Sequence, residues 1–167
     1  QGLALWSPVK GRGARFTVDL PSGPVTVLDD AYNANPTSMA AALEVLAAAR
    51  PIDGVGRVAQ GRRVAFLGDM LELGPDEMAL HEAIADLSFL QGVDIIHCVG
   101  PRMNKLWAKL PPAKRGDWTE EAKPMAARVH RLIDAGDVVL VKGSKGSKVS
   151  EVVDAIKKLS QGTPQAE

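Results

Sequence analysis

Polar and acidic side chains gather directly after one apolar run of the chain. The segment DDAYNANPTSM, residues 29–39, stands between apolar VTVL and alanine-rich AAALEVLAAA. A turn needs only one or two small polar residues, whereas this segment holds two acids, a tyrosine and two asparagines. A carboxylate at the end of a strand can accept hydrogen bonds from both hydroxyls of a ribose or hold a water on Mg²⁺. Asp29 and Asp30 are therefore both candidate nucleotide ligands, and capping of a turn is the alternative for each.

Further residues near this segment suit the same kind of ligand. Asn33 and Asn35 each offer a donor and an acceptor for a base edge or a phosphate, and Asn35 is also placed to cap the helix that follows. Tyr32, the only tyrosine of the chain, either stacks on a planar base or packs against the sheet. Arg12 stands between two glycines, so its backbone can approach a ligand closely while its guanidinium reaches a phosphate or a ribose.

Two more loops carry groups that bind small polar ligands. In LGDMLELG, residues 67–74, Asp69 follows a buried run and a glycine, while Glu72 either pairs with a basic group or stays solvated. In VKGSKGSK, residues 141–148, a strand gives way to a helix whose N-terminal amides favour an anion or a carboxylate. This third loop supplies Lys142, Ser144 and Lys145. A solvated lysine-rich loop is the alternative for it.

Familiar catalytic patterns do not occur in the sequence. The dinucleotide fingerprint, the Walker A loop and the G-x-S-x-G elbow find no match. His81, His97 and His130 fall on separate expected elements without metal-ligand spacing, so no metal site is expected. Cys98 is the single cysteine and lies in an apolar run, which favours a buried thiol. The residues therefore indicate ligand binding without a catalytic residue in this chain.

Strands and helices alternate after residue 25, and this alternation determines where the three loops lie. A short β-hairpin is expected at 14–20 and 25–30, and buried strands at 64–70, 94–100 and 137–143. Helices are expected at 36–50, 75–92, 101–110, over most of 120–136 and at 147–160, with 111–118 as a loop. This pattern predicts an α/β fold, a Rossmann-like and mostly parallel sheet with helices on both faces. In such folds the loops at the carboxyl ends of the strands build the site.

Composition limits the partners and the compartment. The chain has 167 residues, the size of one domain, with 20 basic and 20 acidic side chains. This balance argues against nucleic acid as a partner. No apolar stretch reaches the length of a membrane span, so no membrane insertion is expected. A single cysteine fits a reducing compartment, and we expect the protein to be cytoplasmic. The chain starts at Gln1 without an initiator methionine, so we expect it to be a piece of a longer protein.

Three segments together resemble the C-terminal domain of the Mur ligases. They are LDDAYNANPTSMAAALEVL, GRRVAFLGDMLELG and DVVLVKGSKGSKVSEVV. The strings DDAYNANP and LGDMLELG are the most specific parts, and they are most similar to the branch of the family that adds D-Ala-D-Ala to UDP-MurNAc-tripeptide. Lys145 departs from the pattern, because the family more often has arginine at that place. A stand-alone Rossmann-like nucleotide-binding module, or a Mur or folylpolyglutamate-type ligase with another acceptor, are the alternatives.

The resemblance implies a three-domain ligase of peptidoglycan precursor synthesis. It implies ATP and Mg²⁺ as cofactors, with Mg²⁺ held mainly by a missing central domain, and UDP-MurNAc-tripeptide and D-Ala-D-Ala as substrates. Residues 1–13 would be the tail of the linker from the central domain, residues 14–160 the C-terminal α/β domain, and residues 161–167 a frayed tail. The missing N-terminal and central domains of the same chain would be its partners, and the isolated domain would be inactive.

The resemblance also assigns residues by position. Arg12 and Asp30, with Asp29 as a substitute, would hold the ribose. Tyr32 and Asn33 would face the adenine or the α-phosphate region, and Asn35 would cap the next helix near the phosphates. The acceptor dipeptide would be bordered by Asp69, Met70, Glu72, Lys142, Ser144 and Lys145.

Overall fold

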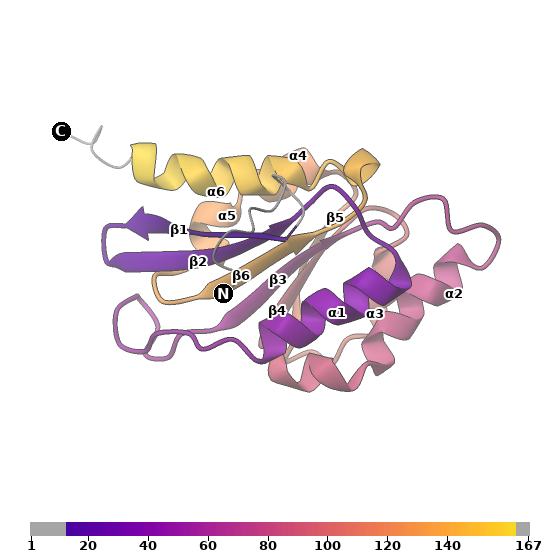
Figure 1. Ribbon diagram of the computed structural model, residues 1–167, viewed down its shortest axis with the longest axis horizontal. Helices are drawn as coiled ribbons and strands as arrows, with labels where there is room; N and C mark the ends of the chain where they lie inside the picture. Colours follow the sequence, from indigo (N-terminus) through magenta and orange to yellow (C-terminus); the bar gives the residue numbers. More distant parts are fainter. Residues whose placement is uncertain (1–12, 163–167) are drawn as a thin grey trace, which may run out of the picture.

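The computed structural model describes residues 13–162, which form one six-stranded sheet between two layers of helices (Figure 1). The strand order is β1-β2-β6-β3-β4-β5. The first two strands pair antiparallel, and the other neighbours pair parallel. The predicted α/β fold, with a mostly parallel sheet that follows a short hairpin, is confirmed.

The elements have the following bounds. The strands are β1 (Ala14–Leu20), β2 (Gly23–Asp30), β3 (Arg63–Gly68), β4 (Ile95–Val99), β5 (Arg115–Thr119) and β6 (Val138–Lys142). The α-helices are α1 (Pro36–Ala47), α2 (Glu77–Glu82), α3 (Asn104–Lys109), α4 (Ala122–Ala126), α5 (Val129–Leu132) and α6 (Ser150–Gly162). Short 3-10 helices are η2 (Ala83–Asp86), η3 (Ser88–Gly92) and η4 (Lys145–Ser147).

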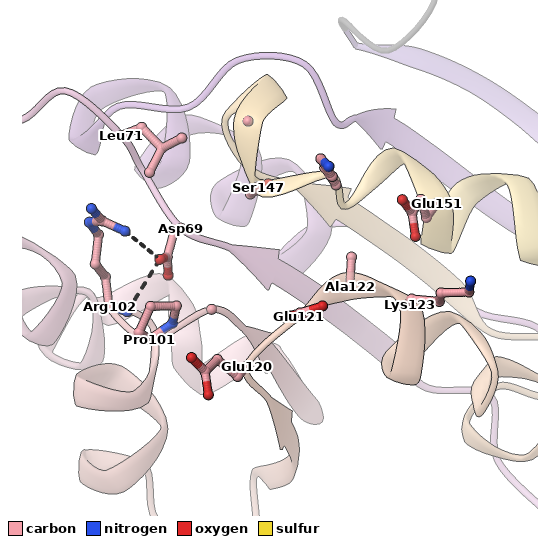
Figure 2. Close-up of a pocket in the computed structure, with 13 residues that line it drawn as sticks. Asp69, Leu71, Pro101, Arg102, Glu120, Glu121, Ala122, Lys123, Ser147 and Glu151 are labelled. Atoms are coloured by element: carbon pink, nitrogen blue, oxygen red, sulfur yellow. Dashed lines mark hydrogen bonds and ion pairs between the residues drawn. The ribbon is translucent and has the colours of Figure 1, made fainter.

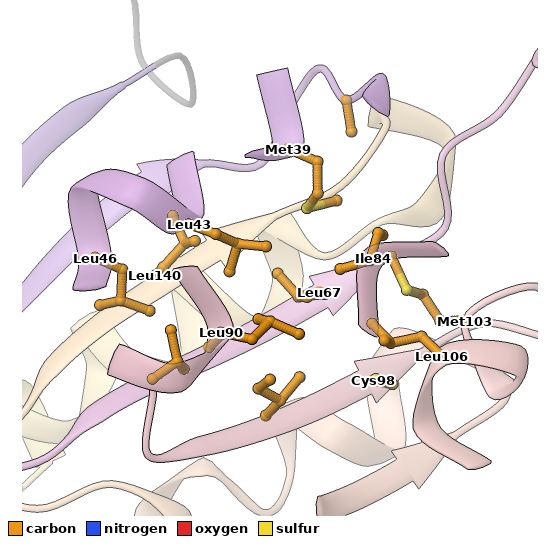
Figure 3. Close-up of a cluster of buried hydrophobic side chains, with 14 of the residues drawn as sticks. Met39, Leu43, Leu46, Leu67, Ile84, Leu90, Cys98, Met103, Leu106 and Leu140 are labelled. Atoms are coloured by element: carbon orange, nitrogen blue, oxygen red, sulfur yellow. The ribbon is translucent and has the colours of Figure 1, made fainter. Parts of the chain in front are cut away.

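Each face of the sheet has its own hydrophobic core. Helices α1, α2 and α3 cover one face, and α4, α5 and α6 cover the other (Figure 1). Because side chains alternate along a strand, Leu28 and Leu140 face the first layer, whereas Val27 and Val139 face the second. Figure 3 shows the first core, in which α1 and its neighbours pack over the sheet through Met39, Leu43, Leu46, Leu67, Ile84, Leu90, Cys98, Met103, Leu106 and Leu140.

The start of α1 agrees with the sequence prediction. Asn35 is the N-cap, and its Oδ1 accepts a hydrogen bond from the backbone N–H of Ser38 at 2.8 Å. The Ser38 Oγ accepts in return from the N–H of Asn35 at 3.0 Å, which completes a capping box. Pro36 occupies the first helical position, where its missing N–H costs nothing. The helix ends at Ala47, before the predicted end near Arg50.

Two predicted elements are wrong, and a third is helical but divided into two helices. Residues 75–92, predicted as one helix, form α2 and two 3-10 helices, because Leu87 has an extended ψ of 131° that interrupts the helix. Residues 111–118, predicted as a loop, contain most of β5, a strand at the edge of the sheet without an apolar run. Residues 120–136 contain two short helices, and the second ends where Ile133 becomes extended. Among residues 13–162, no helix combines the length and apolar character that a membrane span requires.

His97 is a buried histidine in the centre of β4. Its ring stacks on Phe66 with centroids 4.7 Å apart, and its Nδ1 accepts a hydrogen bond from the N–H of Asp117 at 2.9 Å. Burial disfavours the charged imidazolium and lowers the pKa of His97 from 6.5 to about 4, although the charge of Asp117 acts in the opposite direction. The neutral ring is therefore the form that fits the fold.

The chain should lose stability as the pH falls from 6.5 toward 4, because the unfolded state then binds a proton that folded His97 does not accept. At pH 5 this difference amounts to about 2 kcal/mol at most. Above pH 6.5 the ring is neutral in both states, and the contribution is fully retained. Urea denaturation at pH 7.5 and pH 5 measures the loss, and the His97→Gln variant should lose about 2 kcal/mol less than the unmodified chain. An equal loss in the two proteins would contradict this assignment.

Candidate functional site

The three predicted ligand loops meet at the carboxyl edge of the sheet. They follow β2, β3 and β6, and β6 lies between the other two strands. After β2 and β3 the chain enters helices of the first layer, whereas after β6 it enters α6 of the second (Figure 1). A crevice opens where neighbouring parallel strands lead to opposite faces, and ligands of open α/β sheets bind at such points. The loop after β6 thus lies between the two other loops.

Lys142, the last residue of β6, bonds to the loop after β2. Its side chain is only 1% exposed. The ammonium donates to Asp30 Oδ2 at 2.7 Å and to the carbonyl oxygen of Asn33 at 2.8 Å. Asp30 and Lys142 are partners in the parallel register, which places their side chains on the same face of the sheet. A residue expected on the acceptor side therefore contacts the loop expected on the nucleotide side.

Ser144 joins the loop after β6 to both other loops. Its backbone N–H donates to the carbonyl oxygen of Asp69 at 3.0 Å. Its hydroxyl accepts from the N–H of Leu71 at 2.9 Å and donates to the carbonyl oxygen of Ala34 at 3.4 Å. The loops pack so closely that a Cβ on Gly143 would lie 2.9 Å from the Cα of Gly68. The three loops therefore form one hydrogen-bonded unit.

Asp69 is buried and fully engaged by neighbouring groups. Its Oδ1 accepts from the N–H of Met103 at 2.8 Å, and its Oδ2 accepts from the N–H and the Nη1 of Arg102 at 3.2 and 3.0 Å. The Nε of Arg102 donates to Glu77 Oε1 at 2.8 Å. Hydrogen bonds to Glu77 and to Asp69 raise the pKa of the Arg102 guanidinium. The Asp69 carboxylate thus holds the turn before α3 in place.

A pocket of about 500 Å³ opens beside Asp69 and Arg102 (Figure 2). Four loops line it, those that follow β3, β4, β5 and β6. Figure 2 shows the Asp69–Arg102 pair on one side and Glu151 of α6 on the other. Its charged lining residues are of both signs, namely Asp69, Arg102, Glu120, Glu121, Lys123, Lys148 and Glu151. A pocket of this size with both charges suits a small zwitterion.

The remaining residues predicted for the nucleotide lie in different settings. The side chain of Asp29 is buried, whereas that of Asp30 is 24% exposed. Tyr32 is half-buried and packs against the second core. Asn33 and Asn35 are both exposed in the loop that follows β2. Arg12 lies outside the described residues, so its assignment stays a prediction.

The remaining acceptor residues also differ in exposure. Met70 is fully buried, with its side chain in the first core and its N–H bonded to His81. Glu72 is exposed and has a left-handed φ of 63°, which turns the loop after β3. Lys145 is exposed in η4, beside the pocket residues Gly146 and Ser147. The ligand contacts of these residues stay predictions.

Sequence patterns did not reveal two residues that support the loop after β3. His81 is completely buried, and its Nε2 accepts from the N–H of Met70 at 2.9 Å. Its Nδ1 therefore carries the proton and donates to the carbonyl oxygen of Glu77 at 2.6 Å. Arg102 bridges two acids that lie apart in the sequence. No spacing rule marks such contacts, because they depend on which strands become neighbours.

The fold and this edge define an α/β domain in which candidate ligand loops meet at the carboxyl ends of the parallel strands. The chain belongs to the Mur ligase family, because residues 14–145 match the family model described as Mur ligase, glutamate ligase domain. The resemblance drawn from the three sequence segments is confirmed.

Curated relatives and solved structures point to one branch of this family. UDP-N-acetylmuramoyl-tripeptide–D-alanyl-D-alanine ligase of Escherichia coli is 32% identical over 157 residues, which cover 93% of this chain and 31% of the relative. The enzyme of the same name from Mycobacterium leprae is 33% identical, with 92% and 31% covered. MurF from Acinetobacter baumannii superposes with a TM-score of 0.70 at 26% identity, over 94% of this chain and 32% of that one.

A further crystal structure shows the same fold. MurF ligase from Thermotoga maritima in complex with ADP has a TM-score of 0.73 at 23% identity, over 96% of this chain and 34% of that chain. The chain therefore spans about a third of the length of these proteins.

Replacing Asp69 by alanine should destabilise the fold by about 3 kcal/mol, because it leaves the buried N–H of Met103 without its acceptor and breaks a partly buried ion pair with Arg102. Glu77→Ala is the matched control, since it removes a more exposed acid from the same arginine and should cost about 1 kcal/mol or less. Urea denaturation of the two variants gives both values. Equal losses would show that Asp69 has no special structural role.

Proposed function

We propose that this chain is the C-terminal domain of an ATP-dependent ligase that joins D-Ala-D-Ala to UDP-MurNAc-tripeptide in cytoplasmic peptidoglycan precursor synthesis. One observation carries most weight: the loop after β6 bonds to both other ligand loops through Lys142 and Ser144. A ligase must hold a nucleotide and an acceptor close together, and this edge joins the two predicted sites in one unit. The two relatives called UDP-N-acetylmuramoyl-tripeptide–D-alanyl-D-alanine ligase match most of this chain, and they support the same function.

In the proposed reaction, ATP phosphorylates the terminal carboxylate of the tripeptide and leaves as ADP. The amino group of D-Ala-D-Ala then attacks the acyl phosphate, forms the peptide bond and releases phosphate. Mg²⁺ would neutralise the charge on the transferred phosphoryl group. We assign Mg²⁺ mainly to the central domain, as the family resemblance implies. Within residues 13–162, no three His, Cys, Asp or Glu side chains form a group that could hold a metal ion.

The nucleotide side of the edge is assigned to the loop after β2. Asp30 suits the ribose better than Asp29, because its carboxylate is partly exposed while that of Asp29 is buried. Lys142 binds Oδ2 of Asp30, and we assign Oδ1 to a ribose hydroxyl. Asn33 is exposed beside it and Tyr32 is half-buried, as a contact with the adenine or the α-phosphate region requires. Arg12 would reach the ribose from the segment before β1.

The acceptor side of the edge is assigned to the mixed-charge pocket and the exposed residues around it. A dipeptide zwitterion brings one ammonium and one carboxylate, and the pocket offers carboxylates and cations for the two. Glu72 and Lys145 lie on two of the four loops that line it, those after β3 and β6. The chain would act by orientation and electrostatics, since the amine of the acceptor is itself the nucleophile. Closure of this domain over the nucleotide would keep water away from the acyl phosphate.

The isolated chain of 167 residues should show weak or undetectable ATP binding by calorimetry and no ATPase activity, because the proposed phosphate and Mg²⁺ sites lie on the central domain. The whole ligase that contains this chain should turn over ATP repeatedly only when UDP-MurNAc-tripeptide and D-Ala-D-Ala are both present, because the acyl phosphate is consumed only by the dipeptide. Robust ATP turnover by the isolated chain would overturn the proposal. A coupled assay with glutamate in place of the dipeptide tests a related ligase with another acceptor.

In the whole ligase, Asp30→Ala should raise the KM for ATP roughly tenfold, the effect of one lost hydrogen bond to a charged group, with little change in the KM for the dipeptide. Lys145→Ala should raise the KM for the dipeptide with little change in the KM for ATP, because it removes an exposed cation beside the acceptor pocket. Steady-state kinetics with each substrate varied in turn measures both constants. Lys105→Met, which changes an exposed lysine on α3, serves as the control. Equal effects on both KM values in each variant would refute the assignment of Asp30 to the nucleotide and of Lys145 to the acceptor dipeptide.

A further inference from the structure

Lys142 is an unusual residue at the carboxyl edge of the sheet. Lysine is seldom fully buried, because an ammonium loses its hydration unless the protein supplies compensating partners. At this position the alternation along β6 turns the side chain toward the first core, on the same face as Leu140. An apolar side chain would fill such a site at a lower cost. The charge at this position therefore calls for an explanation beyond packing.

The geometry of the ammonium supplies that explanation. Its two acceptors, Asp30 Oδ2 and the carbonyl oxygen of Asn33, lie three residues apart in one loop. One bond fixes the rotation of the Asp30 carboxylate, and the other fixes the path of the backbone beyond it. Because Asp30 and Lys142 are register partners on adjacent strands, the two side chains run side by side. A carboxylate held in this way presents its second oxygen in one direction.

The same geometry does not fit a direct contact between Lys142 and the acceptor dipeptide. The side chain is 1% exposed, and its ammonium donates to Asp30 and to Asn33 in the loop after β2. The pocket on the acceptor side is lined by other cations, among them Arg102 and Lys148. Asp69 at that pocket is held by Arg102 and Met103, and Lys142 takes no part in those bonds.

We propose that Lys142 is a positioning residue that sets the Asp30 carboxylate for the ribose of ATP, and that it acts on ATP only through Asp30. The assignment rests on the proposed function, in which Asp30 binds the ribose. Loss of Lys142 then weakens only the part of ATP binding that depends on the ribose hydroxyls. The dipeptide site keeps its affinity, although Lys142 belongs to the loop that borders it.

The test uses the whole ligase with ATP and with 2′,3′-dideoxy-ATP, which lacks both ribose hydroxyls. The measured quantity is the ratio of the two kcat/KM values, for the unmodified enzyme, Asp30→Asn, Lys142→Met and the control Lys105→Met. We expect Lys142→Met and Asp30→Asn each to lose most of a roughly tenfold preference for ATP, the effect of a hydrogen bond to a charged group. Lys105→Met should keep the full preference, and the KM for the dipeptide should stay within about twofold in every variant.

The double variant Asp30→Asn with Lys142→Met keeps the test informative if Lys142→Met alone fails to fold. It removes both charges of the pair, so no buried charge is left without a partner. We expect it to lose no more of the ATP preference than Asp30→Asn alone. Thermal denaturation of each variant shows which proteins are folded.

Two results separate this inference from the proposed function. If Asp30→Asn keeps the preference for ATP, the ribose assignment in the proposed function is wrong, and the role of Lys142 is overturned with it. If Asp30→Asn loses the preference while folded Lys142→Met keeps it, only the role of Lys142 is overturned. The same conclusion follows if Lys142→Met weakens both nucleotides equally, or if the double variant loses clearly more preference than Asp30→Asn.

Discussion

The position of β6 between β2 and β3 holds the ligand edge together, because a single loop can then bond to the loops on either side. Of the three strands at this edge, β2 comes first in the chain and β6 last, so the contact between Asp30 and Lys142 joins residues that are 112 positions apart. Ser144 makes the corresponding contacts to Leu71 and Ala34. All of these bonds require the parallel register in which Asp30 lies opposite Lys142. The register of one central strand thus determines the shape of the candidate site.

Much of the fold could be predicted because its central strands are continuous apolar runs, and the start of α1 is marked by Asn35 and Pro36. Prediction was wrong for β5 because an edge strand with the sequence RGDWT is selected by its pairing with β4, which no local pattern shows. It was also wrong for residues 75–92, where apolar residues at helical spacing form separate short turns. In both segments tertiary contacts outweigh local preference.

The candidate site shows the same limit at the level of single side chains. An acid after a strand and a glycine is a common ligand position, and the loop that contains Asp69 does lie at the predicted edge. The sequence could not show that the Asp69 carboxylate accepts hydrogen bonds from Arg102 and Met103. These donors lie in the turn that follows the neighbouring strand β4. Buried Lys142 and His81 were hidden for the same reason. The position of a residue in a loop after a strand indicates that it lies near the candidate site. Its contacts there depend on which strands are neighbours in the sheet.

The late place of β6 in the chain also affects how the domain is made. Until residues 138–142 leave the ribosome, β2 and β3 have no strand between them, and each has an unpaired edge of backbone N–H and C=O groups. Contacts between distant parts of a chain form slowly, and the sheet cannot close before β6 has been made. The nascent domain therefore passes through a stage in which two apolar strands are open to pairing with other chains. The strand order that builds the ligand edge thus also leaves the unfinished domain open to aggregation.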